Sequence, residues 1–229
     1  MRDMQSPQGG YYASLDADSE HEEGKFYAWT PEDVQAVLGE ADYPLFAHRF
    51  GLDLAPNFED KWHLHVFQGL RALSQEFSLP IDTIIARIDA SRRELFVARQ
   101  QRVHPGRDEK ILTSWNGLMI KGMAVAGHVL HEPAYLASAE RALDFIRSTL
   151  WQDGRLLAVY KDGRARFNAY LDDYVFVIDA ILALAQARWR DGDLDFAVDL
   201  ADAVLTHFED KDQGGFFFTA DDHEQLIHR

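Results

Sequence analysis

The chain has no cysteine among its 229 residues. Disulfide bonds, thiolate metal ligands and thiol redox chemistry are therefore excluded within it, and a cytoplasmic location is favoured. It is also poor in positive charge, with 23 Lys and Arg against 38 Asp and Glu and a formal net charge of −15. Such a surface repels phosphate backbones, so we expect no nucleic-acid partner.

Long hydrophobic runs are missing as well. No apolar run approaches the roughly 18 residues of a membrane span, and the N-terminal MRDMQSPQGG lacks the apolar core of a signal peptide. We therefore expect no membrane partner. The 47% of hydrophobic residues is nevertheless ample for a buried core. Both ends are abrupt, which suggests a piece of a longer protein.

Helical patterns recur in the second half of the chain. Residues 114–130 and 170–187 are almost continuously apolar, and each run precedes an amphipathic segment, at 135–150 and 194–208. A β-hairpin pattern follows each pair, the first with an Asp-Gly turn at 162–163. A shift of about 58 residues aligns the two units. The repeat predicts an all-α solenoid or closed ring of helical hairpins, with buried helices inside and amphipathic helices outside.

The first half fits this template in part. GGYYASLDADSEHEEGKFYAW has the Gly-Gly, aromatic strand, acidic turn and return strand of a further hairpin. A short helix is then predicted from Pro31 to about Leu38, with Thr30 as its N-cap and Gly39 as its stop.

The remaining stretch is less regular. Residues 40–80 contain Pro, Asn and Asp, which interrupt regular structure, and they are predicted to be rich in loops. In residues 81–102, by contrast, the apolar side chains recur at helical spacing. Ser114 is the predicted N-cap of the first buried helix. Because no linker divides the chain, we predict one domain over 1–229.

Polar and aromatic residues gather where the two buried helices begin, in RDEKILTSWNG and AYLDDYVF. Aromatic rings stack on sugars, and carboxylates bind hydroxyl groups or transfer protons. In a carbohydrate site, Asp172 or Asp173 would be the catalytic proton-transfer group. The substrate-binding candidates beside them are Trp29, Arg107, Asp108, Lys110, Trp115, Asn116 and Tyr174. The alternative role of the aspartate pair is helix capping.

Five carboxylates crowd residues 16–23, and three interpretations are open. The first is a solvated turn. The second is a calcium loop, which is disfavoured because the helix-loop-helix pattern of Gly and Glu is missing. The third is a hairpin over the mouth of the ring, which makes Asp16 and Asp18 binding candidates. Alternatively, Asp16, Asp18 and Glu22 would face basic residues such as Arg107 or Lys110.

Metal and cofactor motifs are weak or missing. His63 and His65 share a strand-like face, but no third ligand stands at a recognisable spacing. The sequence contains no nucleophile elbow, Walker loop or dinucleotide fingerprint. We therefore expect neither a metal nor a cofactor.

Four segments together are similar to a known family. GGYYASLDADSEHEEGKFYAWTP, ARQQRVHPGRDEKILTSWNGLMIKGMAVAG, YLDDYVFVIDAILAL and GGFFFTADDHEQLIHR resemble the thioredoxin-domain-containing family of YyaL-type and spermatogenesis-associated proteins. The resemblance implies an α/α toroid of the six-hairpin glycosidase type, related to N-acylglucosamine 2-epimerases. This chain would be an incomplete ring of that toroid, without the thioredoxin-like domain.

The resemblance implies several functions rather than one. A carbohydrate-active toroid would be glycosidase-like or sugar 2-epimerase-like, and LDDY is similar to the arrangement in unsaturated-glucuronyl hydrolases. The alternatives are a non-catalytic scaffold that docks a thioredoxin-like domain, and an inert truncated fragment. An open ring would also expose apolar inner-helix faces, which predicts self-association.

Overall fold

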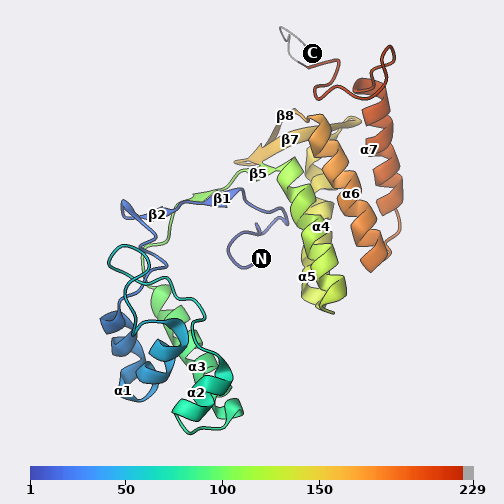
Figure 1. The fold of residues 1–229 in the computed structure, drawn as a ribbon. Coiled ribbons are helices and arrows are strands. Elements are labelled where there is room, and N and C mark those ends of the chain that lie inside the picture. The colour runs from blue at the N-terminus through green and yellow to red at the C-terminus, as the bar shows by residue number, and fades with distance from the viewer. Residues whose placement is uncertain (224–229) are drawn as a thin grey trace. The chain divides into compact units, whose positions relative to one another are not determined.

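The computed structural model describes residues 1–223, and its residues divide into two compact units (Figure 1). Unit 1 combines Met1–Ser14 with the chain from Arg107 onward, and unit 2 is Leu15–Gly106. The prediction of one domain over the whole chain stays a prediction. Among the described residues, no helix is both long and apolar enough to cross a membrane.

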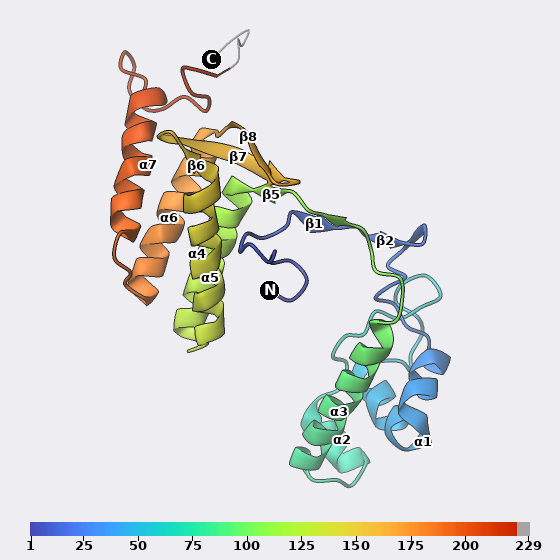
Figure 2. The same cartoon turned by 180° about the vertical axis from the view of Figure 1, so that it is seen from behind.

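Unit 1 is built from two helical hairpins, α4–α5 and α6–α7 (Figures 1 and 2). The helices are α4 (Thr113–Val129), α5 (Pro133–Phe145), α6 (Leu171–Ala187) and α7 (Asp193–His207), and a π-helical turn extends α5 over Ile146–Leu150. The helices α4 and α6 start 58 residues apart and end 58 residues apart, as the repeat predicts. They pack directly on each other, while α5 and α7 lie on their outer sides.

The repeat positions that the sequence aligns are core positions in both hairpins. Ala139, Ile146 and Leu150 are buried in the first hairpin, and their equivalents Ala197, Val204 and Phe208 are buried in the second. One contiguous cluster of apolar side chains holds all six. The helical class with short β-hairpins between helical hairpins is thus confirmed, and the inner and outer layers fit an α/α toroid.

A glycine sets the distance between the two inner helices. A Cβ atom on Gly117 would lie 2.7 Å from the backbone carbonyl carbon of Phe176. Only glycine allows so close an approach, because any side chain would push the helices apart. One turn further along, Lys121 Nζ on α4 lies 2.7 Å from Asp179 Oδ2 on α6.

A small antiparallel sheet lies near the starts of α4 and α6 (Figure 1). Its strands are β5 (Ile111–Leu112), β6 (Trp151–Gln152), β7 (Arg155–Lys161) and β8 (Arg164–Asn168). The turn between β7 and β8 has Asp162 and Gly163 at φ values of 51° and 76°, which confirms the predicted hairpin. The hairpin predicted for 214–229 lies partly outside the described residues, and within them Phe216 forms only an isolated bridge with Glu209.

Unit 2 contains three helices and the acidic hairpin. The helices are α1 (Pro31–Phe50), α2 (Leu70–Glu76) and α3 (Ile81–Arg99). Thr30 Oγ1 accepts a hydrogen bond of 3.2 Å from the Asp33 amide, so the predicted N-cap is confirmed. Gly39 interrupts α1 with a φ of 68°, but a second helical segment follows it. That segment arises from tertiary burial, since Leu45 and Phe46 enter two apolar clusters of unit 2.

The acidic stretch forms a tight hairpin rather than two long aromatic strands. The short strands are β1 (Ser14–Leu15), β2 (Asp18–Ser19) and β3 (Glu22–Glu23), and β4 (Arg107–Asp108) follows α3. Glu20 and His21 form the turn between β2 and β3 at φ values of 53° and 64°. The segment after it, predicted as a strand, is a turn in which the Tyr27 and Ala28 amides donate to the Gly24 carbonyl. Arg102 donates to the carbonyls of Lys25, Phe26 and Ala28 in the same segment.

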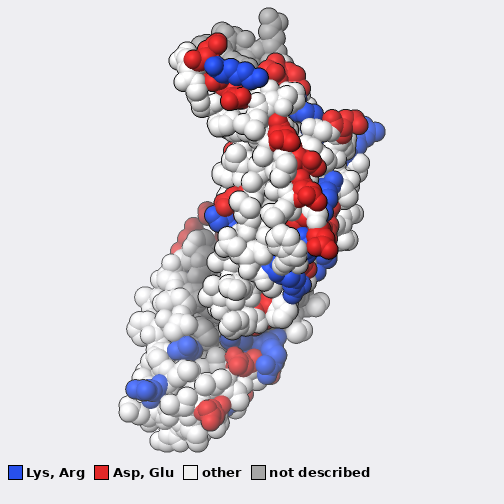
Figure 3. Space-filling view, turned by 90° about the vertical axis from the view of Figure 1, so that its right-hand side faces the viewer, with Lys and Arg blue, Asp and Glu red and all other residues white. Residues whose placement is uncertain are grey.

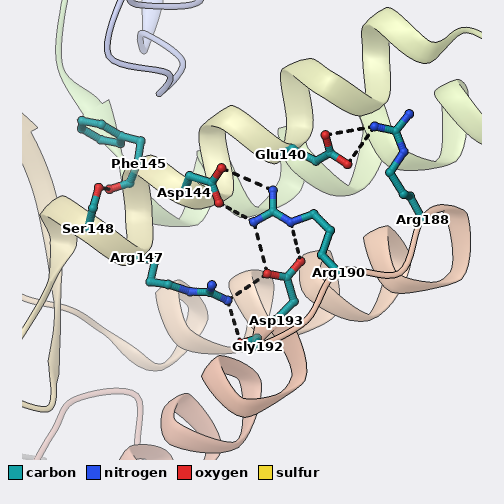
Figure 4. A network of polar contacts seen from close by, with 9 residues as sticks. All are labelled: Glu140, Asp144, Phe145, Arg147, Ser148, Arg188, Arg190, Gly192 and Asp193. Atoms are coloured by element: carbon teal, nitrogen blue, oxygen red, sulfur yellow. Dashed lines mark hydrogen bonds and ion pairs between the residues drawn. The ribbon is translucent and has the colours of Figure 1, made fainter.

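A buried carboxylate fastens α7 to the end of α5 (Figure 4). Asp193, in the first turn of α7, is 1% exposed. Its Oδ1 lies 2.9 Å from Arg147 Nη2, and its Oδ2 lies 3.2 Å from Arg190 Nε. Arg190 also pairs with Asp144 on α5, while Arg188 pairs with Glu140. The loop between α6 and α7 is therefore held to the outer helix of the preceding hairpin.

Removal of the buried carboxylate should destabilise unit 1 strongly. We expect Asp193→Ala to cost about 3–5 kcal/mol of unfolding free energy, because two partly buried guanidinium groups lose their counter-charge. Asp144→Ala is the matched control, and its 56% exposed side chain predicts a loss below about 1 kcal/mol. Urea denaturation measures both, and equal losses would contradict this account.

Candidate functional site

The starts of α4 and α6 are joined by one carboxylate. Asp173, the third residue of α6, is 3% exposed. Its Oδ1 accepts a hydrogen bond of 2.8 Å from the Ser114 amide on α4, and its Oδ2 accepts one of 2.9 Å from the Tyr170 amide. Ser114 is therefore not an N-cap, since Leu112 holds that place and Asp173 satisfies the amide instead.

Burial controls the ionisation of this group. Desolvation raises the pKa of Asp173 from 3.8 to about 6, and the hydrogen bond from the Tyr170 amide opposes the rise. The neighbouring Asp172 carboxylate raises the pKa further by charge repulsion. Asp172 itself is half-buried, and its Oδ1 accepts a hydrogen bond of 3.0 Å from the Asp173 amide. Asp172 is thus the more accessible carboxylate of the pair.

Two further candidates lie in the core. Asn116 is 1% exposed, and its side chain bonds both the amide and the carbonyl of Tyr11 as well as the Leu112 carbonyl. Tyr174 is fully buried, and its hydroxyl oxygen accepts a hydrogen bond of 2.9 Å from the Leu156 amide. These contacts stabilise the start of each inner helix, and a substrate-binding role for either residue stays a prediction.

The other unit 1 candidates are accessible. Trp115 is 55% exposed on α4. Arg107 pairs with Glu109 at 2.6 Å and stacks on the ring of Tyr12, whereas Lys110 pairs with Asp108 at 3.1 Å. Lys110 donates two hydrogen bonds, from its amide and its side chain, that lower the pKa of Asp108.

The last three candidates belong to unit 2. Asp16 and Asp18 are exposed, and Asp16 Oδ1 accepts a hydrogen bond of 3.2 Å from the Asp18 amide. Trp29 is 4% exposed, and the guanidinium of Arg102 lies 4.0 Å from its ring centre. In the same hairpin Glu22 pairs with Lys61 rather than with Arg107 or Lys110.

One group of three side chains in the described part of the chain has the spacing of a metal site. Ligand atoms of His207, Asp221 and Asp222 all lie within 4.8 Å of one another. However, His207 Nδ1 is 2.8 Å from Asp221 Oδ1, and Arg155 pairs with Asp222. A guanidinium on one of the carboxylates opposes a cation at that place.

The structure also shows an apolar stripe on α4 that the site prediction did not include. Its exposed members recur at helical spacing along one face: Trp115, Leu118, Met119, Val125 and Val129. Their exposed fractions run from 38% to 65%, although the sequence predicts α4 to be buried all round.

A second unpredicted feature is a set of three arginines around a cavity of unit 2. Arg92, Arg93 and Arg99 are seven residues or fewer apart on α3, a signal already present in the sequence.

The buried carboxylate makes stability depend on pH. Because the folded pKa of Asp173 exceeds its unfolded value of 3.8, its stabilising contribution is present below about pH 4 and is lost as the pH rises through 6. Relative to Asp173→Asn, the wild type should lose up to about 3 kcal/mol of unfolding free energy between pH 4 and 7. Chemical denaturation at both pH values measures this loss. A pH-independent difference between the two proteins would refute the assignment.

Comparison with known proteins gives relatives but no family model, since none matches the chain. Spermatogenesis-associated protein 20 of Homo sapiens is 30% identical over 251 residues, which cover 94% of this chain and 32% of the human protein. The Rattus norvegicus protein of that name matches equally, at 30% identity over the same shares. An uncharacterised protein of Caenorhabditis elegans is 30% identical and covers 87% of this chain.

A solved structure shares a weaker likeness. Cellobiose 2-epimerase from Bacillus thermoamylovorans matches 92% of this chain and 53% of its own, with a TM-score of 0.44 and 10% sequence identity. The chain spans about a third of the length of the curated relatives that it matches. Over that third, the resemblance to spermatogenesis-associated protein 20 is confirmed.

Proposed function

We propose that unit 1 is a helix-docking module whose α4 stripe binds α6 of a second copy of this chain. The observation that carries this proposal is a coincidence of register. Two members of the exposed stripe on α4, Trp115 and Leu118, occupy the repeat positions of α6 residues that contact α4. The exposed side of α4 therefore resembles the side of α6 that packs on α4 within the chain.

The register is set by two observed contacts. Phe176 packs against Gly117, and Asp173 bonds the Ser114 amide, so both define the side of α6 that faces α4. The 58-residue repeat places Leu118 at the position of Phe176 and Trp115 at that of Asp173. Leu118 and Trp115 are 50% and 55% exposed. That side of α4 therefore has the apolar composition of a contact between inner helices, but no helix in the described part of the chain covers it.

The opposite face of α6 offers the complementary surface. Gly117 and Lys121 face α6 from α4, and the repeat places Val175 and Asp179 at their positions on α6. Val175 is 39% exposed, and Leu182, two turns further along, is 46% exposed. Each copy thus carries one face of each kind, as a head-to-tail contact requires.

Charge favours this occupant over an unrelated apolar helix. Lys121 and Asp179 pair within the chain and stand at equivalent repeat positions. A second copy in the same register brings its Lys121 beside Asp179 of the first, so opposite charges alternate along the contact. Because Val175 replaces Gly117, the two copies pack with a wider helix spacing than α4 and α6 do.

A carboxylate introduced into either face should abolish self-association. We expect the wild type to associate with increasing concentration in sedimentation velocity, and Leu118→Glu and Leu182→Glu each to remain monomeric, because a carboxylate would be buried in an apolar contact. Val97→Glu is the matched control, since Val97 is a 62% exposed residue of α3. Its association should equal that of the wild type.

Mixing the two monomeric variants tests the head-to-tail geometry. Leu118→Glu keeps an intact α6 face and Leu182→Glu an intact α4 stripe, so an equimolar mixture should form a dimer that cannot extend. A mixture that stays monomeric would refute the heterologous contact. A monomeric wild type at every concentration would overturn the proposal, and complex formation with an added thioredoxin-like domain would then assign the stripe to that partner.

A carbohydrate site at the same end is the second candidate. It is favoured by the hydrogen bond between the Ser114 amide and Asp173, which brings together the helix starts that carry exposed Trp115 and half-buried Asp172. An aromatic face beside an accessible carboxylate suits a sugar ring and its hydroxyl groups. In this proposal Asp172 rather than Asp173 transfers the proton, because both oxygens of Asp173 already accept backbone hydrogen bonds.

Ligand binding tests this second candidate directly. We expect cellobiose or glucuronate at millimolar concentration to raise the melting temperature of the wild type by a few degrees, because binding to the folded state alone stabilises it. Asp172→Asn and Trp115→Ala should each remove the shift, whereas the control Asp162→Asn, in the β7–β8 turn, should retain it. No shift with either sugar, or a shift that survives both variants, would contradict the site.

A further inference from the structure

We infer that unit 2 binds a small organic anion in a cavity lined by three arginines of α3. The cavity has a volume of about 570 Å³, within the range of small-molecule sites. Arg92, Arg93 and Arg99 line it together with the apolar side chains of Phe96 and Leu64. This site is independent of the docking faces of unit 1.

The cavity lining is positively charged, whereas the chain as a whole is negatively charged. Asp89 is the single carboxylate among its lining residues, and it lies 3.4 Å from Arg92. In the part of the chain that the structure describes, Arg93 and Arg99 form no ion pair. A chain of net charge −15 therefore holds uncompensated positive charge at one concave place. Low-dielectric walls strengthen the attraction of such a place for an anion.

Arg99 carries the most direct sign of a missing acceptor. Its guanidinium carbon lies 5.3 Å from the ring centres of Phe26 and Tyr27 and 5.6 Å from that of Phe96. Its Nε is buried and has no hydrogen-bond partner among the described residues. A buried donor without an acceptor is destabilising, so an oxyanion at this place would recover stabilisation.

The cavity walls define the rest of the ligand. A second cavity of about 470 Å³ shares Trp29, Leu64 and Arg99 with the first and adds Tyr27 and Phe58. Aromatic walls on both sides of a guanidinium suit an oxyanion attached to a flat apolar body. The planar fork of arginine matches both phosphate and carboxylate. The ligand class is therefore a phosphate or carboxylate of ring-bearing molecules.

Four probes separate the charge from the body of the ligand. Calorimetric titration of the full chain should show binding of phenyl phosphate, of benzoate, or of both, and the tighter of the two identifies the anionic group. Inorganic phosphate should bind at least tenfold more weakly than phenyl phosphate, and neutral benzyl alcohol should not bind. Affinity should fall as NaCl is raised from 50 to 500 mM, because the contact is ionic. Equal binding of benzyl alcohol, or no binding of either anion, would overturn the inference.

Arginine variants test the location. Arg93→Gln removes an exposed side chain, so the fold is unaffected, and it should weaken binding at least fivefold. Arg99→Lys keeps the charge but loses the fork, and it should weaken binding at least tenfold. Arg71→Gln on α2 is the control of matched charge, since Arg71 is exposed and does not line the cavity. If Arg71→Gln weakens binding as much as Arg93→Gln, only the overall charge matters and the site is refuted.

Discussion

A single buried carboxylate holds the two inner helices of unit 1 at a common start. Asp173 accepts one hydrogen bond from an amide at the start of its own helix and one from an amide of α4. It thus satisfies, at two helix starts at once, amide groups that have no acceptor within their own helix. Because burial raises its pKa, this contact is made by a group close to its titration point. Gly117 lies one turn away and permits the close helix packing that the shared cap begins. The rest of the unit follows from this junction: α5 and α7 cover the outer sides, and Asp193 fastens them together.

The same repeat that builds the unit leaves its two faces open. In the described part of the chain, α4 and α6 pack on each other along one side each, and each carries a second side with exposed apolar residues. Apolar residues are therefore exposed on α4 and α6. They are also exposed on α7, where Val198 and Leu205 are 58% and 48% exposed. Exposed Asp195, Asp199 and Asp202 accompany them, and acidic side chains form a column on the α7 side of unit 1 (Figure 3). Such charges disfavour nonspecific association through this outer face.

Much of this organisation is predictable because it depends on local pattern. Helical spacing and the 58-residue shift predict α4 to α7 and their buried positions, and the Asp-Gly turn predicts the β7–β8 hairpin. The failures have local and tertiary causes. The aromatic segment after the acidic hairpin forms a turn at Gly24 instead of a strand, and Arg102, distant in the sequence, donates to three of its carbonyls. Likewise, Ser114 has the composition of an N-cap, but the capping oxygen comes from Asp173, 59 residues away. The sequence identifies candidate site residues by chemical type, and type alone does not separate accessible Asp172 from buried Asp173.

The arginines of the chain differ in how far their hydrogen-bonding groups are satisfied within it. In unit 1 the arginines of the α6–α7 loop are bound to carboxylates of α5 and α7, so they are structural. In unit 2 Arg102 is likewise committed, since three backbone carbonyls and the Trp29 ring hold it, and burial lowers its pKa. Arg99 is held by similar aromatic neighbours but has no acceptor for its buried Nε. Arg99 and Arg102 both need hydrogen-bond acceptors for their guanidinium groups. Arg102 has three backbone carbonyls, whereas the buried Nε of Arg99 has no acceptor among the described residues. In the proposed anion site, an oxyanion would supply the acceptor that the Arg99 Nε has not found among the described residues.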